Sequence, residues 1–92
     1  MEKTTTITMD QTLDHSELFG IMDKNLTTIR DSMDVELIQR DNQLLMKGPD
    51  AEKAADVVKE LIGILESGEK LDTQKVAYVV ALVEKGLSYH VL

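Results

Sequence analysis

The chain has 92 residues, of which 42% are hydrophobic and 29% charged, with a formal net charge of −7 and no cysteine. This length fits one domain, and the composition is that of a globular protein rather than of a disordered chain or a membrane span. Without cysteine there are no disulfides or thiolate metal sites, and the N-terminus lacks a signal-peptide pattern, so we predict a cytoplasmic location and no membrane association. The acidic excess disfavours tight binding of nucleic-acid phosphates, which requires clustered Lys and Arg.

The first predicted element is a strand over residues 3–9, where threonines are frequent and Ile7 and Met9 lie two positions apart. Asp14 has the chemistry of a helix N-cap, and Gly20 ends that helix before it can become long. A strand and a short helix are therefore expected before residue 21.

A second helix is predicted to begin at Asp23, whose carboxylate is expected to accept hydrogen bonds from the free backbone N–H groups of the first turn. Leu26, Ile29 and Met33 then recur at helical spacing. This helix should therefore end near Met33.

A β-hairpin is predicted next. Residues 35–40 and 43–48 have strand composition, and they are separated by Asp41 and Asn42, two residue types that tolerate positive φ in a tight turn. The second strand ends at Gly48, because a proline follows it.

Two further helices are predicted, over residues 50–67 and residues 72–85. In the first, apolar residues repeat at helical spacing opposite a charged face, and Gly68 ends the run. In the second, Asp72 is the cap and a valine-rich face follows. Because β-branched residues favour strands, a strand over residues 76–83 is the alternative, although the length and the cap favour a helix.

The expected order of elements is strand, helix, helix, strand, strand, helix, helix. This order predicts an α+β fold in which a three-stranded sheet has helices on one face. The residues expected in the core between sheet and helices are Ile7, Met9, Leu26, Ile29, Val35, Leu37, Leu44, Met46, Val58, Leu61 and Leu65.

The element order, with a glycine turn between the first two helices, resembles a type I KH domain (β-α-α-β-β-α) followed by an additional C-terminal helix. Residues 18–26 (LFGIMDKNL), followed by the hairpin, are similar to the N-terminal KH-like region of PhoH-type proteins, the phosphate-starvation-inducible family of P-loop ATPases. Residues 68–72 (GEKLD), with Tyr78 and Leu82, resemble the stretch that precedes their ATPase domain. The resemblance covers roughly residues 14–86.

The resemblance implies that residues 1–92 form a single KH-like domain from the N-terminal region of a larger protein. It implies binding of ATP and magnesium in the ATPase domain of that protein. This chain has no GxxxxGKS or GxxxxGKT phosphate loop, so no cofactor is expected in it. The expected function is that of an accessory docking domain, whose partners are its own downstream ATPase domain or identical subunits.

The candidate site is the glycine turn, formed by Gly20, Ile21, Met22 and Asp23. The corresponding GXXG loop of a KH domain lets the nucleic-acid backbone approach closely. Asp23 replaces the second glycine with a carboxylate, so the alternative function is only weak binding of single-stranded RNA. Met22 is expected in the core, with an exposed apolar contact beside Ile21 as the alternative. The residues of the RNA-binding alternative are Gly20, Ile21, Met22, Asp23, Lys24, Asn25 and Arg30.

No residue pattern indicates catalysis, so the chain is not expected to be an enzyme. His15 and His90 are far apart in the sequence and have no cysteine partners, which argues against a metal site. Asp14 and Glu17 are better explained as a helix cap and an acid favoured by the helix dipole than as a catalytic pair.

Overall fold

The computed structural model describes residues 3–87. In chain order the elements are β1 (Lys3–Thr8), α1 (His15–Phe19), a 3₁₀ turn (Ile21–Asp23), α2 (Lys24–Ser32), β2 (Glu36–Arg40), β3 (Gln43–Gly48), α3 (Ala51–Glu66) and α4 (Thr73–Glu84). The fold is α+β, as predicted, and the order β-α-α-β-β-α is followed by an additional C-terminal helix. The last element is a helix, so the strand alternative for residues 76–83 is wrong.

β3 is the central strand of the sheet, and both β1 and β2 pair antiparallel with it. The β1 register runs without interruption from Lys3 opposite Gly48 to Thr8 opposite Gln43, so this strand contains no bulge. Asp41 has a φ of 51° in the turn between β2 and β3. The predicted hairpin with its tight turn is therefore confirmed.

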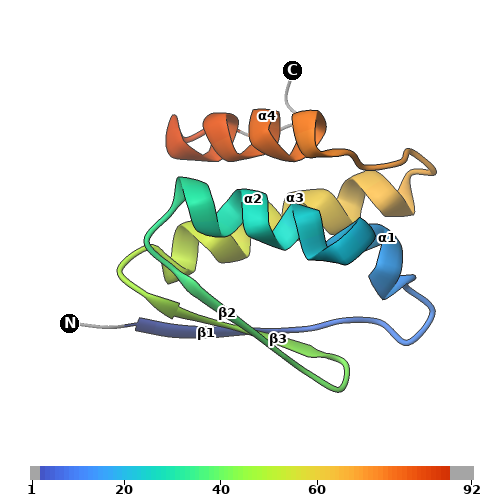
Figure 1. Ribbon diagram of the computed structural model, residues 1–92, viewed down its shortest axis with the longest axis horizontal. Helices are drawn as coiled ribbons and strands as arrows, with labels where there is room; N and C mark the ends of the chain where they lie inside the picture. Colours follow the sequence, from blue (N-terminus) through green and yellow to red (C-terminus); the bar gives the residue numbers. More distant parts are fainter. Residues whose placement is uncertain (1–2, 88–92) are drawn as a thin grey trace.

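The chain is arranged in three layers (Figure 1). The sheet forms one layer, and α1, α2 and α3 cover one of its faces. α4 packs on α2 and α3, on their side away from the sheet, and buries Val76, Val79 and Val80 there. Within residues 3–87, no helix is long and apolar enough to cross a membrane.

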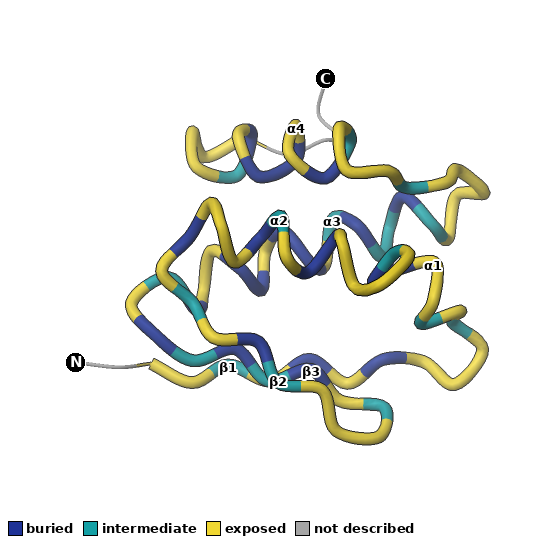
Figure 2. Tube along the Cα trace, viewed as in Figure 1, coloured by how far each residue is buried: buried dark blue, intermediate teal, exposed yellow. Residues whose placement is uncertain are grey.

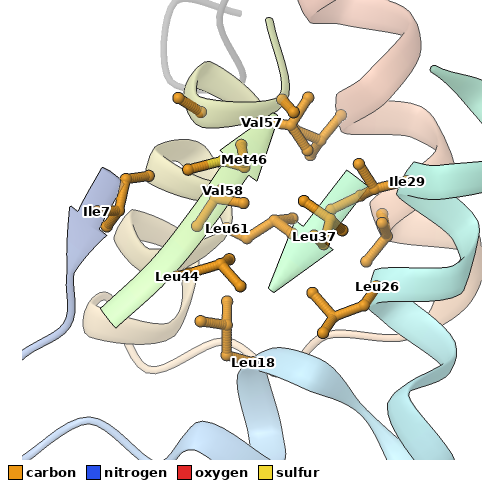
Figure 3. Close-up of a cluster of buried hydrophobic side chains, with 14 of the residues drawn as sticks. Ile7, Leu18, Leu26, Ile29, Leu37, Leu44, Met46, Val57, Val58 and Leu61 are labelled. Carbon is orange, nitrogen blue, oxygen red and sulfur yellow. The ribbon is translucent and has the colours of Figure 1, made fainter. Parts of the chain in front are cut away.

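The core lies between these layers, where buried positions of the strands and helices face one another (Figure 2). Figure 3 shows Leu44 and Met46 of β3 beside Leu61 of α3 in the central cluster. All but two of the residues predicted for the core are buried. Val35, just before β2, and Leu65, in the last turn of α3, are half-buried because they lie at the margins of their elements.

Two helices begin with the predicted caps. Asp14 Oδ1 accepts a hydrogen bond from Ser16 N at 2.9 Å at the start of α1. Asp72 Oδ1 accepts from Lys75 N at 2.7 Å at the start of α4. Both bonds join close neighbours in the sequence, which is why the pattern predicted them.

α3 begins differently, at a long-range clamp. The Asp50 side chain makes no cap bond to its own helix; its Oδ2 accepts from Asp34 N at 2.9 Å, and Asp50 N donates to Asp34 O at 3.2 Å. Gly48 lies beside this pair with a φ of 128°, and a Cβ on it would lie 2.8 Å from Asp34 O. Glycine is therefore needed at position 48 for the close approach of two backbones as well as for the conformation.

Candidate functional site at the glycine turn

The glycine turn joins α1 to α2 through a backbone with several positive φ angles. Gly20, Met22 and Asp23 have φ values of 83°, 54° and 58°. Gly20 N donates to Ser16 O at 2.9 Å and ends α1, while Asp23 N donates to Gly20 O at 3.1 Å and closes the turn. Left-handed backbone is costly for any residue with a Cβ, although Asn and Asp tolerate it better than other residue types. The turn therefore holds strain at Met22.

Asp23 does not cap α2, and the prediction of a side-chain cap is wrong. Its side chain makes no hydrogen bond to the first turn of the helix. The reason is its left-handed backbone, with φ 58° and ψ 28°, because a capping residue normally has an extended backbone that directs its carboxylate toward the next N–H groups. The carboxylate thus remains at the turn without a structural hydrogen bond to that helix.

Asn25, in the first turn of α2, holds the glycine turn against α1. Its Nδ2 donates to Leu18 O at 3.1 Å, and the residue is only 2% exposed. A Cβ on Gly20 would lie 2.9 Å from Asn25 Cγ, so the asparagine occupies the space that the glycine leaves free. Asn25 therefore positions the turn. The sequence carried little signal for this role, because an Asn in a first helical turn is usually exposed.

Ile21 and Met22 are the most exposed large apolar residues of the part of the chain that the structure describes. Their exposed fractions are 81% and 87%. The interpretation of Met22 as core filler is wrong, because its left-handed backbone lies at the tip of the turn, away from the packed layers. The turn thus displays two adjacent apolar side chains on a backbone that the buried Asn25 holds in place.

A pocket of about 400 Å³ lies between the glycine turn and the connection from α3 to α4. Its charged lining residues are Glu17, Lys24, Lys70 and Asp72, two of each sign, and the exposed Ile21 forms part of the wall. The pocket therefore has no net charge that would favour an anion or a cation. The complete lining is Ser16, Glu17, Gly20, Ile21, Lys24, Asn25, Lys70, Leu71, Asp72 and Thr73.

The structure does not bring together the two basic residues of the RNA-binding alternative. Lys24 lines the pocket, whereas Arg30 is exposed on α2 and is not part of the lining. Six residues along a helix turn the side chain by roughly 240°, which places Arg30 on a different face from Lys24. Lys70, from the α3–α4 connection, lines the pocket instead, and although residues 68–72 were noted in the sequence, nothing there indicated that Lys70 lies beside the glycine turn.

The acids and histidines of residues 3–87 form no cluster of the kind that holds a metal ion. No group of three His, Cys, Asp or Glu side chains is close enough together to hold a metal ion. His15 packs against Phe19 with ring centroids 5.9 Å apart, and its buried Nε2 has no hydrogen-bond partner. The pKa of the exposed Asp10 is lowered because the backbone N–H and hydroxyl of Thr12 donate to its carboxylate, which is ordinary turn chemistry. His90 lies outside the described residues.

No family model matches the chain, and comparisons with curated proteins and with solved structures found no match.

Proposed function

We propose that this chain is an accessory docking domain of a PhoH-like cytosolic ATPase, without catalysis of its own, and that it docks through the glycine turn. The exposure of Ile21 and Met22 carries the proposal. When a partner covers two adjacent apolar side chains, their removal from water stabilises the complex. Because Asn25 already fixes the turn, little conformational entropy is lost on binding.

The resemblance of residues 18–26 and 68–72 to PhoH-type proteins supports the class of partner. The partners that the resemblance implies are the downstream ATPase domain, which would bind ATP and magnesium, and identical subunits. The strain at Met22 also supports a docking role, because strained backbone with an exposed side chain is concentrated at binding sites.

An NMR titration of the isotope-labelled chain with the P-loop ATPase domain of a PhoH-type protein tests the proposal. Binding should shift the amide signals of residues 20–24 first. The double substitution Ile21→Ser and Met22→Ser should weaken binding about tenfold or more, because exposed apolar anchors dominate such interfaces. If the partner is instead a second copy that binds at the same turn, these signals should shift when the concentration of the chain alone is raised.

The matched control is Leu87→Ser, which removes another exposed apolar side chain away from the turn. It should leave the affinity unchanged. Equal binding by the native chain and the Ile21→Ser/Met22→Ser variant would show that the glycine turn is not the docking surface.

A second candidate is weak binding of single-stranded RNA at the glycine turn, where Lys24 and Lys70 supply phosphate contacts and the carboxylates of Glu17 and Asp72 limit the affinity. Titration of a labelled RNA oligonucleotide at low and physiological salt tests it, since phosphate binding weakens as salt rises. We expect a Kd no tighter than about 100 µM at physiological salt. A low-micromolar Kd that is lost in Lys24→Ala or Arg30→Ala would replace the docking proposal with RNA binding.

A further inference from the structure

The sheet has one covered face and one open face, and the register shows which residues form the open one. The helices of residues 3–87 all lie on the same side of the sheet (Figure 1). Side chains alternate between the two faces along each strand, and the buried Ile7, Leu44 and Leu37 lie on the helix side. The open face therefore consists of three rows that cross β1, β3 and β2 in that order: Thr4, Lys47 and Glu36; Thr6, Leu45 and Ile38; and Thr8, Gln43 and Arg40.

The open face has an apolar centre and a polar rim, which is the arrangement of a protein interface. Leu45 and Ile38, in the middle row, are half-buried, and the two outer rows carry hydroxyl, amide and charged side chains. Glu36 is the only acid in the three strands, although the chain as a whole has a net charge of −7. Two copies that turn this face toward each other are therefore kept apart by little of the acidic excess, which lies elsewhere on the chain.

We propose that two copies of this chain pack sheet against sheet through the open face, about a two-fold axis that runs parallel to the middle row. Each residue of the middle row then lies over the same residue of the other copy, so Leu45 and Ile38 form the centre of the contact. The two outer rows exchange places, so that Arg40 of each copy lies over Glu36 of the other and Lys47 lies over Gln43. The strands of the two copies run nearly antiparallel, which is the aligned arrangement of sheets stacked about 10 Å apart.

The charges of the outer rows support a second copy as the occupant and select this axis. Within residues 3–87, Glu36, Arg40 and Lys47 form no ion pair, so the contact breaks none. About the proposed axis, each Glu36 lies between Lys47 of its own row and Arg40 of the other copy. A two-fold axis parallel to the strands would instead place Lys47 over Lys47 and Glu36 over Thr4, which brings like charges together and pairs no opposite ones. The open face is thus complementary to itself about one axis and not about the other.

Sedimentation equilibrium of the native chain from about 10 µM to 1 mM tests the proposal. The contact is small, three rows of three side chains on each copy, so we expect a reversible monomer–dimer equilibrium with a Kd of about 0.1–1 mM. Ile38→Lys places two like charges face to face at the axis and should weaken dimerisation about tenfold or more. Gln39→Lys is the matched control, because it adds the same charge at the next position of β2, where the exposed side chain lies on the other face of the sheet. This control should dimerise like the native chain, and circular dichroism of dilute Ile38→Lys checks that the variant is folded.

An exchange of charges tests how the two faces are aligned. Arg40→Glu should weaken the dimer, because it sets two carboxylates against each other at both ends of the contact. Addition of Glu36→Arg should restore the dimer, since the opposite charges are then paired again with their places exchanged. Both positions are exposed in β2, so neither substitution disturbs the core.

A native chain that remains monomeric at all concentrations leaves the open face to a different partner and overturns the proposal. A folded Ile38→Lys variant that dimerises as tightly as the native chain also overturns it, as does an Arg40→Glu dimer that Glu36→Arg fails to restore. The Ile21→Ser/Met22→Ser variant should retain the dimer, so this result is independent of docking at the glycine turn.

Discussion

At the scale of single residues, Met22 has the conformation least suited to its type. Its φ is 54°, and its side chain makes little contact with the rest of the chain. Met22→Gly should therefore raise the free energy of unfolding by about 0.5–1 kcal/mol, because glycine adopts positive φ without steric cost. Chemical denaturation measures this change. If the turn is the docking surface, the same variant should bind its partner more weakly while it is more stable.

Met22→Ala is the control for this substitution, because alanine keeps the Cβ and hence the strain, and its stability should stay close to that of the native chain. Asp23→Gly should gain less than Met22→Gly, since aspartate tolerates the left-handed region better than methionine. A less stable Met22→Gly chain would contradict the assignment of strain to Met22.

The buried amide of Asn25 gives a second prediction at this scale. Asn25→Asp is isosteric, but it removes the donor to Leu18 O and buries a carboxylate, so we expect a loss of about 1–3 kcal/mol near neutral pH. Burial raises the pKa of this carboxyl above the value of about 3.9 in the unfolded chain. The variant should therefore be close to native stability near that pH and lose stability as the pH rises through the folded-state pKa.

Denaturation of Asn25→Asp across this pH range, with the native chain in parallel, checks both the size and the sign. Asn42→Asp, in the hairpin turn where aspartate is tolerated, is the matched control and should change little at any pH. A loss of stability that is the same at all pH values would show that packing rather than charge is responsible.

Residues with local partners were predictable from the sequence, and those with distant partners were not. Asp14 and Asp72 bond to N–H groups two or three residues away, so their capping pattern is visible in the sequence. Asp50 looks like the same kind of cap, yet its partner Asp34 lies 16 residues away. Asp23 has the composition of a cap, but its left-handed backbone is set by how α1 and α2 meet at Gly20.

At the scale of elements, the junction between β3 and α3 depends on the lack of a side chain at Gly48. Gly48→Ala must adopt a φ of 128° and must also displace Asp34 O from its added Cβ. Gly68→Ala provides a comparison, because Gly68 also has a positive φ, of 95°, but faces open space. We expect Gly68→Ala to lose about 1 kcal/mol from backbone strain alone, and Gly48→Ala to lose more.

Urea denaturation of both variants separates the two costs, because only the steric part differs between them. Equal losses would mean that the loop before β2 moves aside without cost. In that case the Asp34–Asp50 clamp would not fix the distance between β2 and α3.

At the scale of the whole molecule, α4 forms the third layer and is expected to unfold together with the sheet. Val76 and Val79 are fully buried against the layer below, as Leu44 is in the sheet. Backbone amides of α4 and of β3 should therefore show the same free energy of opening in native-state hydrogen exchange. A lower value for α4 alone would show that it detaches as a separate unit and uncovers α2 and α3.

The fold was predictable at this scale because apolar periodicity decides which face of each element is buried. The strands, the hairpin and the order of helices all follow from that pattern. The candidate site was predictable only in its location. The display of Ile21 and Met22 depends on backbone conformation, and the contribution of Lys70 depends on how the α3–α4 connection crosses the turn. The spacing of residues in the sequence predicts neither property.

The clamp between Asp34 and Asp50 also bears on the order in which the chain folds. It joins residues 16 apart and encloses the β2–β3 hairpin, so this unit closes at a small entropic cost. β1 pairs with β3 across a far longer stretch of chain and should join the sheet late. Until it does, one side of β3 is open to the β1 strand of another molecule. Refolding at high concentration should therefore produce exchanged dimers, with β1 strands swapped between chains, whereas refolding at high dilution should not.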